Sequence, residues 1–276
     1  MNNEKTGKTK VKDKFWIFTS RAHDDDIYLA RCKEKTMNWS RITPAEGAFM
    51  LGVPNAMMIV SDGQPVSYSA EAYGTMESFC RMKNVLWSVK GSGAFRIGNE
   101  EQFICDLAEK YPNVSGAYLD DMFGWDEDGS NEELYANELK EIRERLDKAC
   151  RPMEIWATCY IKDVQKYSAK MYDPIDVVTI WNMDTSKIDN LEEEFEMYET
   201  LLPNKKKALG IYMFDYPTGS SVTLERMEKQ CETGLKWLRE GKIEGMVFLT
   251  NCTMGIGLPS EKWLRDWIDK VGDEEL

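Results

Sequence analysis

The feature that most constrains the fold of this chain is a regular alternation of short apolar runs with segments of helical periodicity. Eight runs rich in β-branched and aromatic residues occur at residues 15–19, 56–60, 85–89, 116–119, 154–158, 177–181, 208–214 and 245–249. Each is apolar nearly throughout, which is typical of strands buried on both faces of a parallel sheet. The pattern therefore predicts a series of βα units.

The segments between these runs carry apolar residues at helical spacing. Tyr135, Leu139, Ile142 and Leu146 form one such stripe, and similar stripes cover residues 191–202, 224–238 and 263–271. One apolar stripe per segment indicates helices that pack on a sheet with one side and face water with the other.

The number and size of the units favour a closed barrel. Residues 15–276 hold eight units of about 33 residues each, close to the size of a βαβ element. An open doubly wound sheet would usually carry a glycine-rich phosphate turn after its first strand, and here that segment is TSRAHDDD. We therefore predict the α/β class: a single (β/α)8 TIM barrel over residues 15–276, preceded by a flexible polar tail over residues 1–14.

Charge and composition exclude several partners. The chain has 35 Lys and Arg against 48 Asp and Glu, a net charge of −13, which would repel nucleic acid and anionic membranes. It contains no signal-peptide pattern and no stretch long enough to span a membrane, so we expect a cytoplasmic protein. Oligomeric state is left open.

Metal and cofactor chemistry is not indicated. His23 is the single histidine, and the seven cysteines are scattered without C-x-x-C spacing. Neither a zinc site nor a Ser-His-Asp triad is predicted, and no cofactor is expected.

Chemistry in such barrels lies at the C-terminal ends of the strands, and here those positions are polar and aromatic. Aromatic rings cover the C–H faces of a sugar while carboxylates and amides bind its hydroxyls, so we predict a carbohydrate ligand. The predicted binding residues are Arg21, Asp62, Trp87, Lys90, Trp125, Tyr160, Trp181, Asn182, Tyr212, Tyr216 and Asn251. The run Asp24–Asp26 is expected to be a solvated segment or a helix cap.

The sharpest motif is VSGAYLDDMFGWD, in which Asp120 and Asp121 close the fourth predicted strand. Two like charges a few ångströms apart cannot both ionise cheaply, so one carboxyl pKa should rise. We expect Asp121 to be that group. A protonated carboxyl beside an ionised one is the basis of acid/base glycoside chemistry.

This motif resembles the fourth-strand signature of barrel glycoside hydrolases, and the adjacent pair is similar to that of O-GlcNAc hydrolases. The resemblance implies that Asp120 orients an acetamido group and that Asp121 protonates the leaving oxygen. The chain departs from the chitinase pattern D-x-x-D-x-D-x-E because no Glu follows the aspartates. A further resemblance, to the α-galactosidase group, would make Asp121 a nucleophile and Asp184 the acid.

The partner of Asp121 is left open among Asp120, Asp184 and Asp215. A carboxyl separation of about 5–5.5 Å would indicate a retaining mechanism, and about 6.5–9.5 Å an inverting one. The predicted function is hydrolysis of a glycosidic bond. The alternatives are a barrel that binds carbohydrate without cleaving it, and a sugar-phosphate isomerase or lyase that uses Lys90 or Lys162.

Overall fold

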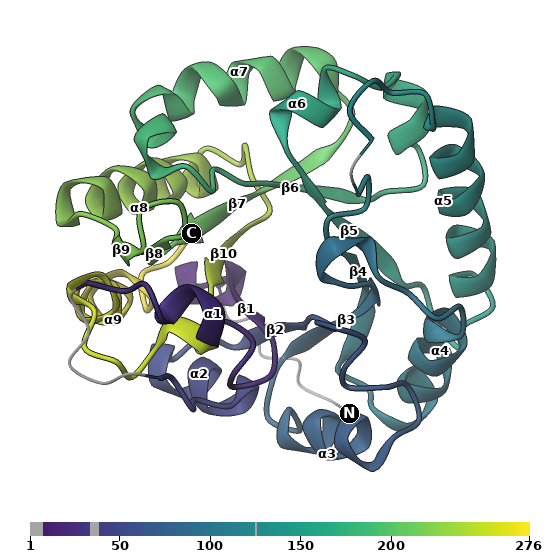
Figure 1. Ribbon diagram of the computed structural model, residues 1–276, viewed down its shortest axis with the longest axis horizontal. Coiled ribbons are helices and arrows are strands. Elements are labelled where there is room, and N and C mark those ends of the chain that lie inside the picture. Colours follow the sequence, from purple (N-terminus) through teal and green to yellow (C-terminus); the bar gives the residue numbers. More distant parts are fainter. Residues whose placement is uncertain (1–7, 34–38, 125) are drawn as a thin grey trace.

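The computed structural model describes residues 8–33, 39–124 and 126–276. Its eight parallel strands close into a barrel in the order β1-β10-β7-β6-β5-β4-β3-β2 (Figure 1). The strands are β1 (Phe15–Thr19), β2 (Asn55–Met58), β3 (Asn84–Lys90), β4 (Val114–Leu119), β5 (Glu154–Cys159), β6 (Val177–Ile180), β7 (Lys206–Tyr212) and β10 (Gly245–Leu249). The predicted (β/α)8 TIM barrel is confirmed.

The strand bounds follow the apolar runs closely. β1 and β10 coincide with the predicted runs, and the other barrel strands begin and end within two residues of them. The run at residues 208–214 leaves the barrel at Tyr212. The next residues form β8 (Phe214–Asp215), which pairs antiparallel with β9 (Ser220–Ser221) in a small separate sheet.

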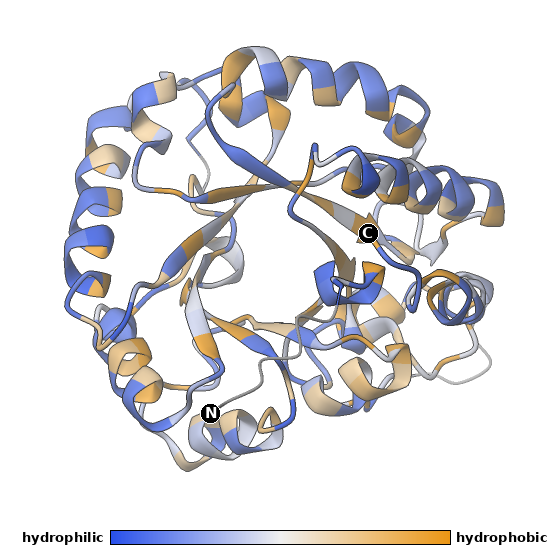
Figure 2. Ribbon diagram, turned by 180° about the vertical axis from the view of Figure 1, so that it is seen from behind, coloured by the Kyte–Doolittle hydropathy of each residue, from blue (hydrophilic) through white to orange (hydrophobic). Residues whose placement is uncertain are grey.

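Helices surround the strand ring, and their apolar residues turn toward it (Figure 2). In α8, the buried residues Met227, Cys231 and Leu235 lie on one face, as the sequence stripe predicts. The α-helices are α1 (Asp26–Leu29), α2 (Pro44–Leu51), α3 (Ala70–Ser78), α4 (Glu100–Lys110), α5 (Glu132–Leu146), α6 (Ile161–Val164), α7 (Leu191–Leu201), α8 (Leu224–Arg239) and α9 (Pro259–Val271). The 3-10 helices are η1 (Val11–Lys14), η2 (Ser92–Ala94), η3 (Ala169–Tyr172), η4 (Thr185–Asn190) and η5 (Asn251–Thr253).

The amino-terminal segment differs from the predicted flexible tail over its described part. Val11 opens η1 and is fully buried, and its backbone N–H donates to the carbonyl of Glu274 at 2.9 Å. Lys10 and Lys12 both pair with Asp273. The burial of Val11 and these ion pairs tie the segment to the end of the chain. Residues 1–7 lie outside the described residues.

Aromatic side chains fill the barrel interior. Trp16 packs on Trp156 with ring centroids 4.9 Å apart, and Phe18 lies edge-on to Tyr118 and Trp181 at 5.9 and 5.7 Å. This packing closes the interior below the C-terminal strand ends, so the barrel has a floor rather than a pore. Among the described residues, no helix combines the length and apolar character that a membrane span requires.

Candidate active site

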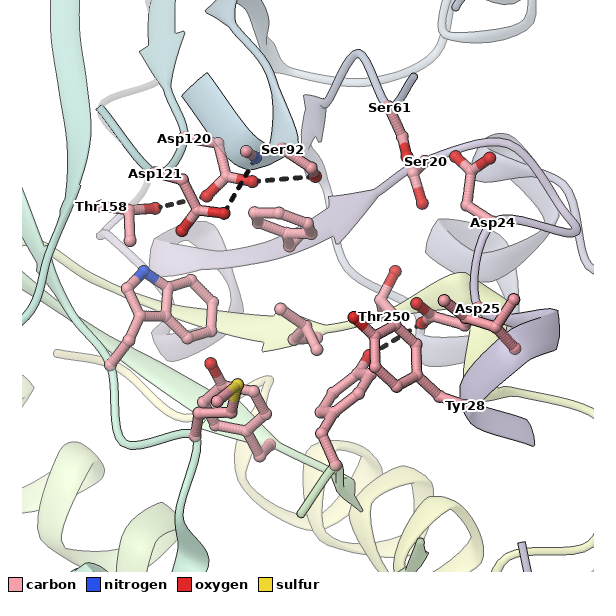
Figure 3. A pocket seen from close by; sticks show the side chains of 18 of the residues that line it. Ser20, Asp24, Asp25, Tyr28, Ser61, Ser92, Asp120, Asp121, Thr158 and Thr250 are labelled. Atoms are coloured by element: carbon pink, nitrogen blue, oxygen red, sulfur yellow. Dashed lines mark hydrogen bonds between the residues drawn. The ribbon is translucent and has the colours of Figure 1, made fainter. Parts of the chain in front are cut away.

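A cavity with two lobes opens at the C-terminal ends of the strands, and Figure 3 shows the first lobe. The first lobe has a volume of about 370 Å³ and lies between the segments that follow β1 and β4. The second has a volume of about 590 Å³ and extends toward the segments that follow β5 and β6. Both lobes share lining residues, among them Asp121, Tyr160 and Trp181, so they form one continuous site of a size that suits a small ligand.

Asp120 lies buried at the end of β4. Its Oδ1 accepts a hydrogen bond from the Thr158 hydroxyl at 2.9 Å, and its Oδ2 accepts one from the Ser92 hydroxyl at 3.1 Å. Burial raises the pKa of Asp120 to about 7; the charge of Asp121 adds to the rise, and the two hydroxyls oppose it in part. This carboxyl therefore keeps its proton to a higher pH than an ordinary aspartate does.

Asp121 is half-buried and lines both lobes. Its backbone has a φ of 43°, in the left-handed region, and its Oδ2 accepts the Gly93 backbone N–H at 3.0 Å. Aspartate tolerates this conformation better than most residues. The turn thus directs the two adjacent carboxyls into the same cavity with different degrees of burial.

A buried network of hydroxyls supports Asp120 from below. The Tyr118 hydroxyl lies 2.9 Å from that of Thr158 and 2.8 Å from that of Thr179. Thr158 donates its proton to Asp120, and Thr179 donates its proton to the Ala157 carbonyl at 2.9 Å. The Trp181 indole N–H donates to the Thr179 hydroxyl at 2.7 Å, which fixes the ring at the cavity floor.

A second pair of carboxyls, Asp24 and Asp25, lines the first lobe on the side opposite Asp120 and Asp121 (Figure 3). Asp24 accepts bonds from the Arg21 guanidinium at 2.8 Å and from the Arg21 backbone N–H at 2.9 Å. Asp25 precedes α1 and accepts the Tyr216 hydroxyl at 2.8 Å. Burial raises the pKa of Asp25 to about 6.

The sequence interpretation of Asp24–Asp26 as a solvated run or helix cap holds only in that Asp25 is the N-cap residue of α1, without a side-chain capping bond, because Asp24 and Asp25 both line the lobe. α1 folds back beside the mouth, and Ile27 and Tyr28 line the same lobe. The signal was available, because the three aspartates follow the first strand at the end where barrel chemistry is found.

Of the six aromatic residues predicted at the site, Tyr160, Trp181, Tyr212 and Tyr216 line the cavity. Trp87 does not, because it is fully buried under α4, where its ring lies 5.7 Å from that of Phe103. Trp125 lies outside the described residues.

The other predicted binding residues divide into two groups. Asp62 lines the first lobe, and Asn182 lines the second, as does Lys162, the lysine of the isomerase or lyase alternative. The side chains of Arg21, Lys90 and Asn251 are not among the lining residues because each has a structural partner. Arg21 pairs with Asp24, Lys90 pairs with Glu138 at 2.8 Å, and Asn251 binds the Ser20 backbone at its N–H and its carbonyl.

Two of the predicted catalytic carboxylates have capping roles. Asp184 lines the second lobe, but it is exposed and accepts the backbone N–H and the hydroxyl of Ser186 at the start of η4. Asp215 is buried in β8 and is not among the residues that line either lobe. It accepts the Thr185 hydroxyl and, at 3.0 Å, the Thr218 backbone N–H. The structure therefore brings Asp120, Asp121, Asp24 and Asp25 together in the first lobe.

Metal ligands do not gather at this mouth: across the described ranges, no group of three or more His, Cys, Asp or Glu side chains is arranged to hold a metal ion.

The sequence matches no protein-family model and no curated protein. The fold is similar to that of the GH99 endo-α-mannosidase from Bacteroides thetaiotaomicron, with a TM-score of 0.57, 10% identity and coverage of 94% of this chain and 97% of that one. The α-L-arabinofuranosidase from Thermotoga maritima gives a TM-score of 0.57 at 14% identity, over 93% of this chain and 70% of the other.

Not every structure similar to this one is a glycosidase. A probable 2-pyrone-4,6-dicarboxylic acid hydrolase from Acinetobacter baumannii matches with a TM-score of 0.53 and 9% identity, over 94% of this chain and 92% of that one. Similarity at these identities establishes the TIM-barrel fold alone, and the chemistry must be argued from the site itself.

Proposed function

We propose that this protein is a glycoside hydrolase that cleaves a glycosidic bond in the first lobe of the cavity. The observation that carries the proposal is the pair Asp120 and Asp121, two adjacent carboxyls in an aromatic-lined pocket, of which the buried one has a raised pKa. The solved glycosidases of similar fold support the same class.

The unequal burial of the pair suggests a division of roles. Asp120 is enclosed, and burial and the charge of Asp121 raise its pKa, whereas Asp121 is more open and lines both lobes. A carboxylate in that position can stabilise the positive charge that develops at the anomeric carbon, or attack it. Of the two roles that the sequence left open for Asp121, proton donor or nucleophile, we propose the anionic one.

The aromatic lining supports a carbohydrate as the ligand. Tyr160, Trp181, Tyr212 and Tyr216 offer ring faces and edges, while Ser20, Ser61 and Thr250 add hydroxyls to the same lobe. Rings that cover the apolar faces of a sugar beside hydroxyls that bind its polar edge form the usual composition of a sugar site.

The two lysines of the isomerase or lyase alternative differ in environment. Lys90 is buried in an ion pair with Glu138 and also donates to the Met122 carbonyl at 3.0 Å, so it does not face the cavity. Lys162 is exposed at the edge of the second lobe. Because a Schiff-base lysine is normally desolvated, this arrangement favours the glycosidase over the lyase.

The test is a panel of aryl glycosides, including N-acetylhexosaminides, assayed with the unmodified protein and with Asp121→Asn. We expect hydrolysis of at least one substrate and its loss in the variant, while calorimetry still detects binding of the sugar. If the unmodified protein binds sugars and hydrolyses none of the panel, the proposal is wrong and the carbohydrate-binding barrel replaces it.

A further inference from the structure

We infer that Asp25 is a second catalytic carboxyl of the cavity and that it donates the proton to the leaving oxygen from the wall opposite Asp121. This inference rests on the proposed function. It assigns to the segment after β1 a role that the strand-end motifs did not indicate.

Asp25 differs from Asp24 and Asp26 in the side chain that binds its carboxyl. Asp24 pairs with Arg21 at 2.8 Å, and Asp26 pairs with Arg41 at 2.9 Å. Asp25, between them, has a neutral partner, the hydroxyl of Tyr216. Arginines therefore balance two of the three charges, while the third group lines the lobe with a tyrosine as its hydrogen-bond donor.

Asp25 is also held in place. Tyr216 lines the lobe beside it and packs edge-on against Tyr28 at 5.0 Å and Phe214 at 5.2 Å. A proton donor must keep its geometry while the substrate binds, and a carboxyl that accepts a bond from a packed tyrosine meets that need.

Its position relative to Asp121 suits a pair of carboxyls acting on one bond. β1 and β4 are separated in the barrel by β2 and β3, so their ends lie on different sides of the mouth. Figure 3 shows Asp120 and Asp121 on one side of the pocket and Asp24 and Asp25 on the other. A sugar bound between them would have one carboxyl on each side of its anomeric centre, as glycoside hydrolysis requires.

The other carboxyls of the first lobe are less suited to this role. Asp24 is tied to Arg21 and Asp62 is exposed to solvent at the rim. Asp120 is enclosed by the hydroxyls of Ser92 and Thr158 on the same side as Asp121.

The electrostatic surroundings of Asp25 are consistent with a proton donor near neutral pH. The titratable groups that face it are Asp24 and Asp26 in its own segment, Tyr216 after β8 and Cys252 in η5. Burial raises the pKa of Asp25 to about 6, the charges of Asp24 and Asp26 contribute to the rise, and the bond from Tyr216 opposes it.

The proposed step balances as follows. The Asp25 carboxyl gives its proton to the glycosidic oxygen while the bond from that oxygen to the anomeric carbon breaks, and the electron pair of the bond stays on the oxygen. Asp121 stabilises the charge left on the carbon. Water supplies a hydroxyl to the anomeric carbon, and its remaining proton restores Asp25, so the products are the free sugar and an alcohol.

The experiment compares Asp25→Asn with the matched control Asp26→Asn, whose parent residue pairs with Arg41 and is not among the lining residues. Each variant is assayed on an aryl glycoside with a poor leaving group and on one with a good leaving group. We expect Asp25→Asn to lower kcat/KM by about 10²–10⁴-fold on the poor leaving group and by far less on the good one. Asp26→Asn should not show this dependence on the leaving group; because the charge of Asp26 contributes to raising the pKa of Asp25, its pH–rate profile should move only slightly, to lower pH.

Tyr216→Phe gives a second readout that does not depend on the folding of Asp25→Asn. Loss of the hydroxyl removes a bond that lowers the pKa of Asp25, so the alkaline limb of the pH–rate profile should move to higher pH. A purely structural role for Asp25 would not produce that change.

The outcomes separate the inference from the function on which it rests. If the unmodified protein hydrolyses glycosides and Asp121→Asn is inactive, yet Asp25→Asn cleaves the poor leaving group normally, the inference is wrong and the proposed function stands. Equal loss on both substrates also overturns it, since a proton donor matters less to a good leaving group. If the unmodified protein hydrolyses nothing, both fail together.

Discussion

The mouth of the barrel contains two pairs of adjacent aspartates that differ in their surroundings. Asp120 and Asp121 follow β4, and the side chains that bind Asp120 are the neutral hydroxyls of Ser92 and Thr158. Asp24 and Asp25 follow β1, and Asp24 is paired with the guanidinium of Arg21. The same Asp-Asp dipeptide thus lies in two different surroundings. After β4 its buried carboxyl is bound by neutral hydroxyls, and after β1 one of its two carboxyls is paired with an arginine.

This difference shows how environment assigns protons among identical side chains. On the β4 wall, burial and the charge of Asp121 raise the pKa of Asp120 to about 7. On the β1 wall, burial raises the pKa of both Asp24 and Asp25, that of Asp25 to about 6, and the Arg21 guanidinium opposes the rise at Asp24. Each wall thus holds a carboxyl that keeps its proton to a higher pH than an ordinary aspartate does.

The largest expected effect comes from removing the charge on the β4 wall. Asp121→Asn should lower kcat by about 10³-fold or more, because the amide neither attacks nor stabilises the anomeric centre. The loss should be the same for good and poor leaving groups, in contrast with the selective loss expected at Asp25. Steady-state kinetics on both substrates measures this; a loss confined to the poor leaving group would instead make Asp121 the proton donor.

The next effect is on stability and its pH dependence. Asp120 titrates near 3.8 in an unfolded chain and near 7 in the folded protein, so between these values the folded state binds the extra proton. The free energy of unfolding therefore falls as pH rises through this window because of this group. Asp120→Asn removes that contribution, so the free energy of unfolding of the variant should fall less with rising pH across this window than that of the unmodified protein.

Urea unfolding of both proteins at pH 4.5 and pH 8 measures this change. A stability difference between Asp120→Asn and the unmodified protein that is the same at both pH values would contradict the placement of the proton on Asp120.

The same two pairs of aspartates show how much of the fold and of the candidate site can be predicted from the sequence. The barrel was predictable because strands buried on both faces must be apolar throughout, and that pattern is local. The carboxyls at the end of β4 were predictable because they adjoin such a strand directly. Asp25 was not, because its role depends on how the segment after β1 folds back and on Tyr216, which is 191 positions away in the chain.

The sequence led us to expect the raised pKa at Asp121 rather than at Asp120, for a related reason. Sequence adjacency shows that Asp120 and Asp121 repel each other, but it does not show which one is buried by Thr158 and Ser92. Asp215 was proposed as a catalytic carboxyl because the seventh apolar run continues to residue 214. β7 instead ends at Tyr212, which places Asp215 in the separate β8-β9 sheet.

A smaller effect tests the support beneath Asp120. Tyr118→Phe removes a buried hydroxyl that lies within 2.9 Å of those of Thr158 and Thr179, and leaves both without that partner. We expect a loss of about 1–3 kcal/mol in the free energy of unfolding. Thermal unfolding should show a fall of several degrees. Tyr135→Phe is the matched control: its hydroxyl bonds to the Phe123 carbonyl outside this network, in a half-buried position, so a smaller loss is expected.

The smallest expected effect concerns the aspartate that the structure places outside both walls. Asp215→Asn keeps an oxygen that accepts the Thr218 backbone N–H, and its amide can donate to the Thr185 hydroxyl. The charge is lost but the bonds are retained, so the free energy of unfolding should fall by about 1 kcal/mol or less, with kcat unchanged. Kinetics and urea unfolding of the same preparation test both parts. A large fall in kcat without a loss of stability would mean that Asp215 contacts the substrate, in contrast with its position outside the lining of both lobes.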